Sequence, residues 1–309
     1  MGTRIKDLQV TKVVDGDTIR VRLNNKDESL RLVCVDTEEK TGSPKPPHTK
    51  AGELATQFAQ TFFADADGKL VKVDLEFDTD DSVNVCLVKH RDNFGRLLCY
   101  VHKSTENYNL RLVREGWSPY FVKYGRSRIY HEALTAAEGK AQAENLVIWN
   151  PATNGNGPAR DYLALQSWWG WRDAIVQDYR QVEGSIKVIS VRLDYQKILD
   201  AIDTGETVTV LCDLQDGIIK RGTKGALIKA GSDFREFNLW IPDITSDEGI
   251  AIVDLLQKRY VAIKQGVEET GGRGYAYVSG QVEQYRNTPQ MVLTNYQQIS
   301  DLPPEQIWE

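Results

Sequence analysis

Residues 8–36 alternate between apolar and polar side chains and are interrupted by turn signals, which restricts this stretch to extended strands. The segments QVTKVV, TIRVRL and SLRLVCV are rich in Val, Ile and Leu, and Asp-Gly at 15–16 and Asn-Asn-Lys-Asp at 24–27 separate them. Alternation with period two turns one face of a strand toward a core, and Asp-Gly favours a tight turn. We predict a β-meander over these residues.

Helical spacing replaces this alternation later in the first half of the chain. Leu54, Phe58 and Phe62 recur at intervals of four residues and predict a helix over about 51–64. The remaining pattern predicts helices over 109–115 and about 130–144, extended segments at LVKVDLEF, VNVCLV and RLLCYV, and a turn at 92–95.

The length of 309 residues exceeds that of a usual single domain, so we expect two domains. The stretch PATNGNGP at 151–158 has the composition of a linker, and the helix expected over about 159–181 carries Trp168, Trp169 and Trp171. Packing of this helix onto a domain is the favoured role of the indoles, with base stacking as the alternative. The predicted division is 1–150, a connecting segment at 151–183, and 184–309.

Residues 184–309 return to short strands with glycine turns, among them TVTVLCDL, GALIKA and GYAYVSGQVEQY. A hairpin turn is expected at 286–288, and helices near 195–203 and 250–256. This pattern favours a small closed β-barrel. The expected fold class is mainly β with α.

Composition is that of an ordinary soluble globular chain, with 41% hydrophobic and 27% charged residues. No apolar run approaches the roughly 18 residues that span a bilayer, so no membrane partner is expected. The first 30 residues lack a signal-peptide pattern, which leaves a secreted location if a leader was removed and a cytoplasmic one otherwise. The four cysteines lack zinc spacing, and whether Cys86 and Cys99 pair stays open.

The net charge of −6 is unevenly distributed. Residues 1–150 hold 22 Lys and Arg against 22 Asp and Glu, whereas 151–309 hold 16 against 22. A nucleic-acid-binding protein with this balance would hold phosphate locally through a few arginines, without a broad basic field.

Charged residues gather at the predicted strand ends of the first half. Asp17 and Asp36 end neighbouring strands of the meander, so their carboxylates can approach one another. Taken alone, Asp-Gly-Asp is ordinary turn chemistry, but two carboxylates suit a hard cation such as Ca²⁺. Alternation turns Arg31 to the face opposite its leucine neighbours, and an arginine beside such an ion suits a phosphodiester. The other charged residues at these ends are Asp15, Glu38, Glu39 and Arg96.

The ordered set DGDT, LRLVCVDTEE and DNFGRLL resembles the staphylococcal (micrococcal) nuclease, or thermonuclease, family over about residues 8–149. The resemblance implies a five-stranded OB-type barrel with helices and a bound Ca²⁺, with Asp15 near the ion without ligating it. By the same resemblance, the metal ligands are Asp17, Asp36 and the Thr37 carbonyl, the catalytic residues are Arg31, Glu39 and Arg96, and the substrate contacts are Phe94, Tyr120 and Tyr124.

The chain departs from the family pattern at several positions. Glu38 replaces the usual proline and is expected to place an extra carboxylate beside the metal. Phe94 replaces a tyrosine, and Val122 stands where a second nucleotide-facing tyrosine is usual, with Tyr120 as a substitute. The acidic run DTDD at 78–81 is expected to be a solvated loop.

The activity implied by the resemblance is that of a calcium-dependent, sugar-non-specific endonuclease. It would act as a monomer on DNA and RNA, preferably single-stranded, and hydrolyse the 5′-oxygen bond to leave 3′-phosphate ends. The alternative is an inactive nucleic-acid- or protein-binding module, favoured if salt bridges to Arg31 and Arg96 occupy Asp17 and Asp36 and leave no room for an ion. The second domain resembles an OB-fold, which binds single-stranded nucleic acid or serves as a structural module. Its candidate stacking residues are Phe237, Trp240, Tyr275, Tyr277 and Tyr285.

Overall fold

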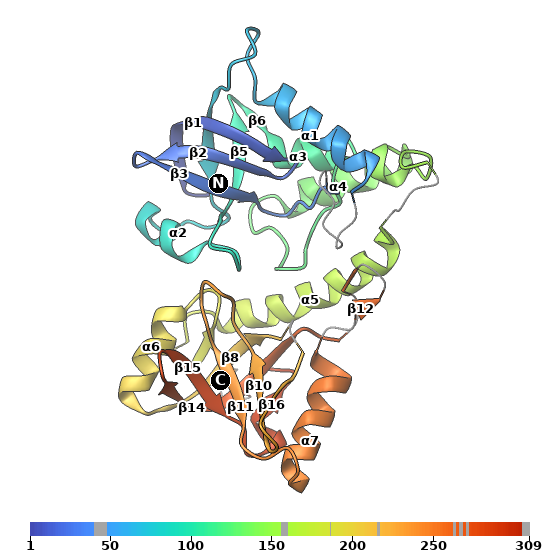
Figure 1. Ribbon diagram of the computed structural model, residues 1–309. Coiled ribbons are helices and arrows are strands. Elements are labelled where there is room, and N and C mark those ends of the chain that lie inside the picture. Colours follow the sequence, from blue (N-terminus) through green and yellow to red (C-terminus); the bar gives the residue numbers. More distant parts are fainter. Residues whose placement is uncertain are drawn as a thin grey trace. The chain divides into compact units, whose positions relative to one another are not determined.

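The computed structural model describes residues 1–39, 48–155, 160–185, 187–214, 217–261, 264–265, 268–269 and 272–304 (Figure 1). The chain divides into two compact units, Met1–Trp169 and Gly170–Glu309. The boundary falls inside the long helix α5 (Tyr162–Val182). Among the described residues, no helix has the length and hydropathy required to cross a bilayer.

A closed barrel of five strands forms the centre of the first unit. β1 (Arg4–Asp15), β2 (Thr18–Leu23) and β3 (Lys26–Leu32) form the predicted meander. β4 (Lys72–Glu76) pairs antiparallel with β1, and β5 (Leu97–Lys103) pairs antiparallel with β4. β5 also runs parallel to β3, and this pairing closes the barrel. The predicted barrel fold is confirmed for this unit.

The helices α1, α3 and α4 lie together beside the barrel, and α2 lies apart from them (Figure 1). Their positions confirm the three helices predicted from spacing. The Thr49 side chain caps α1 by accepting a hydrogen bond from Gly52 N at 3.1 Å. The elements outside the barrel are α1 (Lys50–Phe62), α2 (Val83–Lys89), β6 (Glu106–Asn107), α3 (Tyr108–Arg114), α4 (His131–Ala143) and η1 (Val147–Trp149).

The prediction of an extended segment at 83–88 is wrong, because this stretch forms α2. Cys86 is its buried residue, whereas Val85 and Val88 are 42% and 70% exposed. A short apolar run fits a strand or a helix equally well, and only the position of the core decides between them. Cys86 and Cys99 are both buried free thiols.

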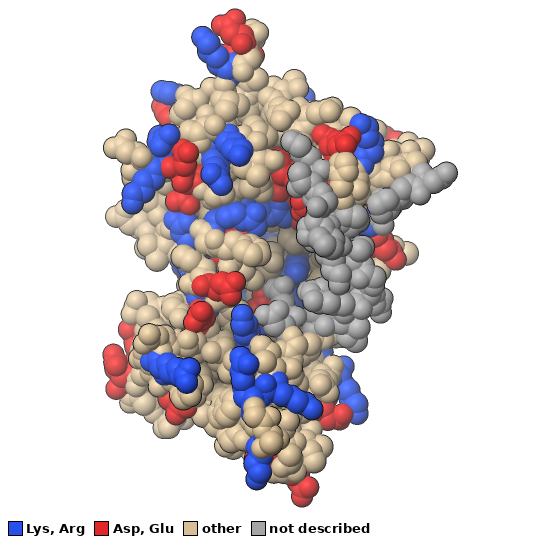
Figure 2. All heavy atoms as spheres, viewed as in Figure 1, with Lys and Arg blue, Asp and Glu red and all other residues tan. Residues whose placement is uncertain are grey.

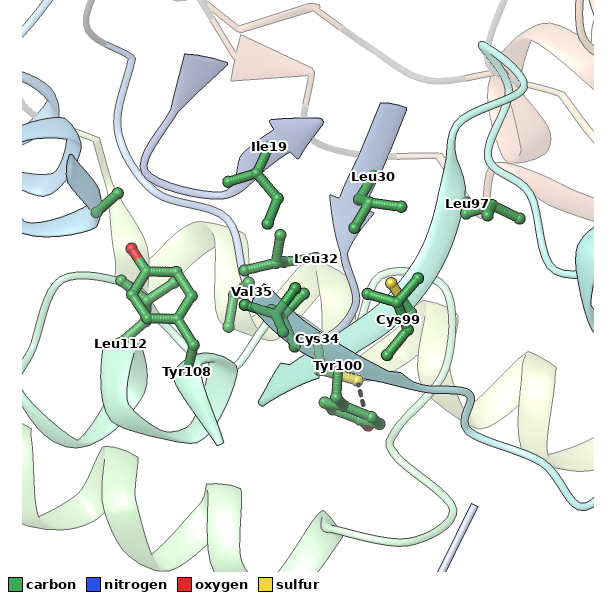
Figure 3. Packing of buried hydrophobic residues seen from close by; sticks show 14 of the residues in the cluster. Ile19, Leu30, Leu32, Cys34, Val35, Leu97, Cys99, Tyr100, Tyr108 and Leu112 are labelled. Carbon is green, nitrogen blue, oxygen red and sulfur yellow. Dashed lines mark hydrogen bonds between the residues drawn. The ribbon is translucent and has the colours of Figure 1, made fainter. Parts of the chain in front are cut away.

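The interior of the barrel is filled by alternate residues of its strands. Leu30 and Leu32 point into the core and are at most 1% exposed (Figure 3). Arg31 lies between them and therefore faces outward, as the alternation predicts. Tyr108 and Leu112 of α3 complete the same core (Figure 3).

A strongly mixed sheet forms the second unit, with the order β7-β8-β14-β15-β11-β10-β9 and β16 paired with β14. Asp213 N donates to Ala230 O at 3.2 Å, which links the end of β8 to the end of β10. The predicted hairpin turn connects Tyr285 to Thr288. The strands are β7 (Val188–Ser190), β8 (Thr207–Asp213), β9 (Ile219–Arg221), β10 (Gly225–Lys229), β11 (Asn238–Ile241), β12 (Lys264–Gln265), β13 (Glu268–Glu269), β14 (Tyr275–Tyr285), β15 (Thr288–Val292) and β16 (Ile299–Ser300).

Two helices of this unit, α6 (Tyr195–Thr204) and α7 (Asp247–Leu255), match the helices predicted near 195–203 and 250–256. Two shorter elements are η2 (Leu256–Tyr260) and η3 (Tyr296–Gln298). Phe237, Tyr275 and Tyr277 are at most 7% exposed, so their candidacy as stacking residues is wrong. Trp240 is half-buried and Tyr285 is 57% exposed.

The beginning of α5 packs within the first unit. Trp168 and Trp169 are 6% and 1% exposed and form an apolar cluster with Tyr162 and Leu165. Phe121 and the other partly buried residues of this cluster pack against it. These two indoles therefore fix the helix to a domain, in accordance with their favoured role.

Candidate active site

The turn between β1 and β2 brings Asp17 to the end of β3. A Cβ atom built on Gly16 would lie 2.8 Å from Thr37 Oγ1 and 2.9 Å from Thr37 Cγ2. The Tyr108 hydroxyl donates a hydrogen bond to the Gly16 carbonyl at 3.0 Å. A side chain at position 16 would press on the Thr37 side chain and on Ala55 Cβ, which favours glycine there.

Asp17 and Asp36 converge on the guanidinium group of Arg31. Arg31 Nη1 bonds to Asp17 Oδ2, and Arg31 Nη2 bonds to Asp36 Oδ1. Thr37 N donates to Asp17 Oδ2 at 2.9 Å, and Asp36 N donates to Ser118 Oγ at 2.8 Å. The two strand ends are thus side by side, and both carboxylates reach one positive group.

A hard cation needs several oxygen ligands around it. Within the parts of the chain that the structure describes, no three acidic, histidine or cysteine side chains are grouped as a metal shell. Asp17 and Asp36 nevertheless direct carboxylate oxygens at one position, which the Arg31 guanidinium now holds. A Ca²⁺ ion at that position would exchange with Arg31 and complete its shell with backbone and water oxygens. The chemistry of these donors therefore fits such an ion.

Arg160 is a second cation on Asp36. Its Nη1 lies 2.8 Å from Asp36 Oδ2, and the two side chains are 13% and 19% exposed. The Arg160 guanidinium also lies over the rings of Tyr162 and Trp169, at 5.5 and 5.7 Å from their centroids. Burial raises the pKa of Asp36, but attraction to Arg160 and Arg31 outweighs it and lowers the pKa overall.

Glu39 has mainly negative neighbours. Burial, then repulsion from Asp17 and Asp15, raises the pKa of Glu39 to about 7. Asp36 adds to the repulsion, and a hydrogen bond with Asp15 acts in the same direction. Asp15 is itself held by Thr56, whose hydroxyl donates to Oδ1 at 2.7 Å. A carboxyl group with such a pKa can accept a proton at neutral pH.

The expectation that Glu38 lies beside the metal is wrong. Its side chain is buried, and both carboxylate oxygens have partners in the segment that follows the barrel. The Tyr162 hydroxyl donates to Oε1 at 2.9 Å, and Asn154 Nδ2 donates to Oε2 at 3.0 Å. Asn154 Oδ1 also accepts from Ala51 N at 2.9 Å, at the start of α1. Glu38 therefore anchors chain segments to each other.

Arg96 lies on the same outer face of the barrel as Arg31. Leu98 pairs with Arg31 in the parallel β3–β5 ladder, and Arg96 precedes Leu98 by two residues. Arg96 Nε donates to Asp92 Oδ2 at 2.7 Å, so its partner is Asp92 rather than Asp17 or Asp36. Phe94 is 76% exposed, and the Arg96 guanidinium lies 5.3 Å from its ring centroid.

The two candidate tyrosines differ in environment. Tyr120 is 6% exposed; its hydroxyl accepts from Ser127 N at 2.9 Å and lies 3.0 Å from His131 Nδ1. This burial argues against contact between Tyr120 and a nucleotide. Tyr124 is half-buried, and Lys123 Nζ lies 5.6 Å from its ring centroid.

Sequence reasoning missed Arg160, Asn154 and Tyr162. No spacing rule connects residues in a linker-like stretch to the strand end at Asp36. The available signal was the sequence Arg160-Asp161-Tyr162 itself, a cation two residues before the aromatic residue that begins the Trp-rich helix.

The visible surface of the first unit carries Lys, Arg, Asp and Glu side chains interspersed (Figure 2). This agrees with the balanced charge of residues 1–150. The positive groups relevant to the site are therefore the individual arginines at the carboxylates.

The first unit is a closed five-stranded barrel, and its carboxylates and arginines gather on one outer face. This arrangement defines a class of small barrel proteins that can hold a cation and an anion together. A family model described as staphylococcal nuclease homologue matches residues 29–151. The thermonuclease of Staphylococcus intermedius is 31% identical over 140 residues, which are 45% of this chain and 74% of that protein. The thermonuclease of Staphylococcus hyicus is 32% identical over 143 residues, or 46% and 75%. The endonuclease YncB of Bacillus subtilis is 29% identical over 147 residues, or 48% and 63%.

The chain belongs to the staphylococcal nuclease family. The family model ends at residue 151, so Arg160 lies beyond the matched region.

Proposed function

We propose that this protein is a calcium-dependent endonuclease that hydrolyses DNA and RNA, preferably single-stranded, and leaves 3′-phosphate ends. The observation that carries the proposal is the convergence of Asp17 and Asp36 on one position with Glu39 beside them, because a cation could take that position in place of Arg31. Arg96 pairs with Asp92 instead, so the pairing with both arginines that would favour the inactive module is only partly present. The similarity to thermonucleases and to an endonuclease supports the same reaction class.

Asp17, Asp36 and the Thr37 carbonyl are the proposed ligands of the ion. When bound, Ca²⁺ supplies positive charge that polarises a phosphate oxygen. Arg31 would be free to bind the phosphate if Asp17 and Asp36 held an ion, and Arg96 could approach from the neighbouring position on the same face. Two guanidinium groups then stabilise the charge that develops on the phosphate oxygens.

Glu39 is the proposed general base. The Glu39 pKa of about 7 without an ion would fall beside one, so Glu39 would be ionised at neutral or mildly alkaline pH and could accept a proton from water. Water then attacks phosphorus, the bond to the 5′-oxygen breaks, and the released 5′-oxygen takes a proton from the solvent. Phe94 and Tyr124 are the proposed nucleotide contacts, because Phe94 is exposed beside Arg96 and Tyr124 is half-buried near Lys123.

Cleavage of single-stranded DNA by the purified chain, with Ca²⁺ or with a chelator, tests this function. We expect calcium-stimulated cleavage, and Arg31→Ala should lower kcat about 10² to 10³-fold because it removes a donor to the transition state. Arg22→Ala serves as a control, since Arg22 is 52% exposed and pairs with Asp27 in the β2–β3 hairpin. Calcium-independent binding without cleavage would instead support the inactive binding module.

The second unit is the proposed binding site for the single strand. Ile219, Leu227, Trp240 and Val292 lie in register across neighbouring strands, and all four are half-buried. The Trp240 indole lies over Gly225, where a Cβ would come within 2.2 Å of Cη2. An aromatic face of this kind can stack on bases.

Binding of a fluorescent single-stranded oligonucleotide to Trp240→Ala in the Glu39→Gln background tests this role. Loss of one stacked base should weaken binding about 5 to 150-fold, equivalent to about 1–3 kcal/mol. Tyr296→Ala is a control, because Tyr296 is 45% exposed and lies outside the four-residue row. If the Glu39→Gln protein and its Trp240→Ala and Tyr296→Ala variants bind the oligonucleotide with equal affinity, the second unit has a structural role.

A further inference from the structure

We propose that Arg160 is an additional substrate-binding residue, which holds the phosphate next to the scissile one. The inference rests on the proposed nuclease function and concerns a residue outside the family-matched stretch 29–151. It extends the site from the barrel to the segment that follows it.

The position of Arg160 relative to Arg31 carries the first step. Arg31 bonds to Oδ1 of Asp36, and Arg160 lies 2.8 Å from Oδ2 of the same carboxylate. The two guanidinium groups therefore occupy adjacent places on either side of Asp36. Arg31 also bonds to Asp17, so Arg160 is the one farther from the Asp17 end of the site.

The surroundings of Arg160 carry the second step. Tyr162 and Trp169 lie within 5.7 Å of its guanidinium, which limits the positions the group can take. Tyr162 is fixed by its hydrogen bond to Glu38 and by its contact with Trp149, 5.2 Å between ring centroids. An arginine held in this way loses little conformational entropy when it binds an anion.

Glu38 and Asn154 form the anchor that positions this segment. Asn154 joins Glu38 to the first turn of α1 through Ala51 N. Glu38 is 2% exposed, so its two hydrogen bonds are shielded from water. The residue that replaces the usual proline thus has a function here: it fixes the segment that carries Arg160 next to Asp36.

The last argument concerns the charges of the carboxylates and arginines at the site. Without an ion, Asp17 and Asp36 neutralise Arg31 and Arg160. A divalent cation on the same carboxylates would take up their negative charge and leave both arginines without these partners. A nucleic-acid strand supplies phosphates in succession, so a second arginine beside the first fits the neighbouring phosphate.

The test compares Arg160→Gln with the parent protein in two measurements. The first measurement is made in the Glu39→Gln background with Ca²⁺. We expect Arg160→Gln to weaken binding of a fluorescent single-stranded oligonucleotide about tenfold or more. The slope of log affinity against log salt should become less negative by about 0.7. In the active protein, KM should rise by a similar factor and kcat should change less than about threefold, because the contact is away from the reacting phosphate.

Two further variants separate binding from structure. Arg160→Lys keeps the charge and should recover most of the salt slope, whereas a purely structural role would make the Lys and Gln variants alike. Arg22→Gln removes an exposed arginine about five residues, or roughly 16 Å, along β2 from Asp17 and should change neither measurement.

Other outcomes overturn the inference. Tighter binding or faster cleavage by Arg160→Gln would mean that Arg160 blocks the site, and unchanged affinity and salt slope would mean that it contacts no phosphate. If the parent protein neither binds nor cleaves the oligonucleotide, the nuclease function itself fails. If the parent protein does both and Arg160→Gln matches it, only the role of Arg160 fails.

Discussion

Negative and positive side chains alternate in space at the site. Arg31 lies between Asp17 and Asp36, and Arg160 contacts Oδ2 of Asp36, the oxygen that Arg31 does not bond. Removing one member leaves a poorly solvated charge without its partner, which costs far more than an exposed pair contributes. Glu39 is different, because its neighbours are carboxylates and its pKa rises to about 7.

Calcium binding should therefore release a proton in a pH-dependent manner. Below pH 7 Glu39 is mostly protonated without the ion, and nearby positive charge lowers its pKa, so a proton leaves. We expect nearly one proton released per ion at pH 6 and almost none at pH 8, measured by calorimetry in buffers of different ionisation enthalpy. Glu39→Gln should release none. Equal release by the parent protein at both pH values would refute the assignment.

Gly16→Ala should destabilise the first unit. The added Cβ would lie 2.8–3.0 Å from Thr37 and Ala55 atoms, so the turn or the β3 exit must shift. We expect the free energy of unfolding to fall by about 1–3 kcal/mol, measured with denaturant. Gly139→Ala is the matched control: nothing lies within 4 Å of that Cβ, and alanine favours the interior of α4. A Gly16→Ala protein as stable as the parent would contradict the close packing.

At the scale of elements, loops fixed by side chains place the functional groups. The expected solvated loop at 78–81 is instead partly structural. Asp78 accepts hydrogen bonds from Arg128 N at 2.8 Å and from Ser127 Oγ at 3.1 Å. Asp81 Oδ2 lies 3.2 Å from His90 Nε2 at the end of α2. Asp78 thus holds the chain just after Tyr124.

Asp78→Ala should disturb the segment that carries Tyr124. The Arg128 N–H would lose its hydrogen bonds to Asp78, and the Ile129 N–H would keep only the Ser127 hydroxyl, which costs about 1–3 kcal/mol of unfolding free energy. We also expect a raised KM with little change in kcat, measured by steady-state cleavage. Asp80→Ala should behave like the parent, since Asp80 is exposed. Equal effects of the two variants would show that Asp78 is not the anchor.

At the scale of the whole molecule, the net charge of −6 disfavours broad attraction of nucleic acid. The first unit is balanced, and its surface mixes both signs (Figure 2). Binding must then come from a small number of placed cations and from apolar or aromatic contacts.

The salt dependence of oligonucleotide binding should accordingly be shallow. Two to four phosphate contacts predict a slope of log affinity against log salt of about −1.4 to −2.8 for a single strand. Fluorescence anisotropy of the Glu39→Gln protein at several salt concentrations measures it. A slope steeper than about −5 would indicate an extended basic surface and would contradict the local binding argued for here.

The sequence by itself determined the meander, the helices beside the barrel and the outward face of Arg31, because periodicity records which side chains meet the core. It also contained the ordered set of carboxylates and arginines, since these occur within motifs of a few residues. Tertiary structure decided what depends on contacts between distant residues. Residues 83–89 form the helix α2 because the core lies on the side where Cys86 is buried. Glu38 bonds to Tyr162 and Asn154, and Arg160 contacts Asp36 although 124 positions separate them in the sequence. No local pattern encodes such a distance, because the folded chain alone brings these side chains together.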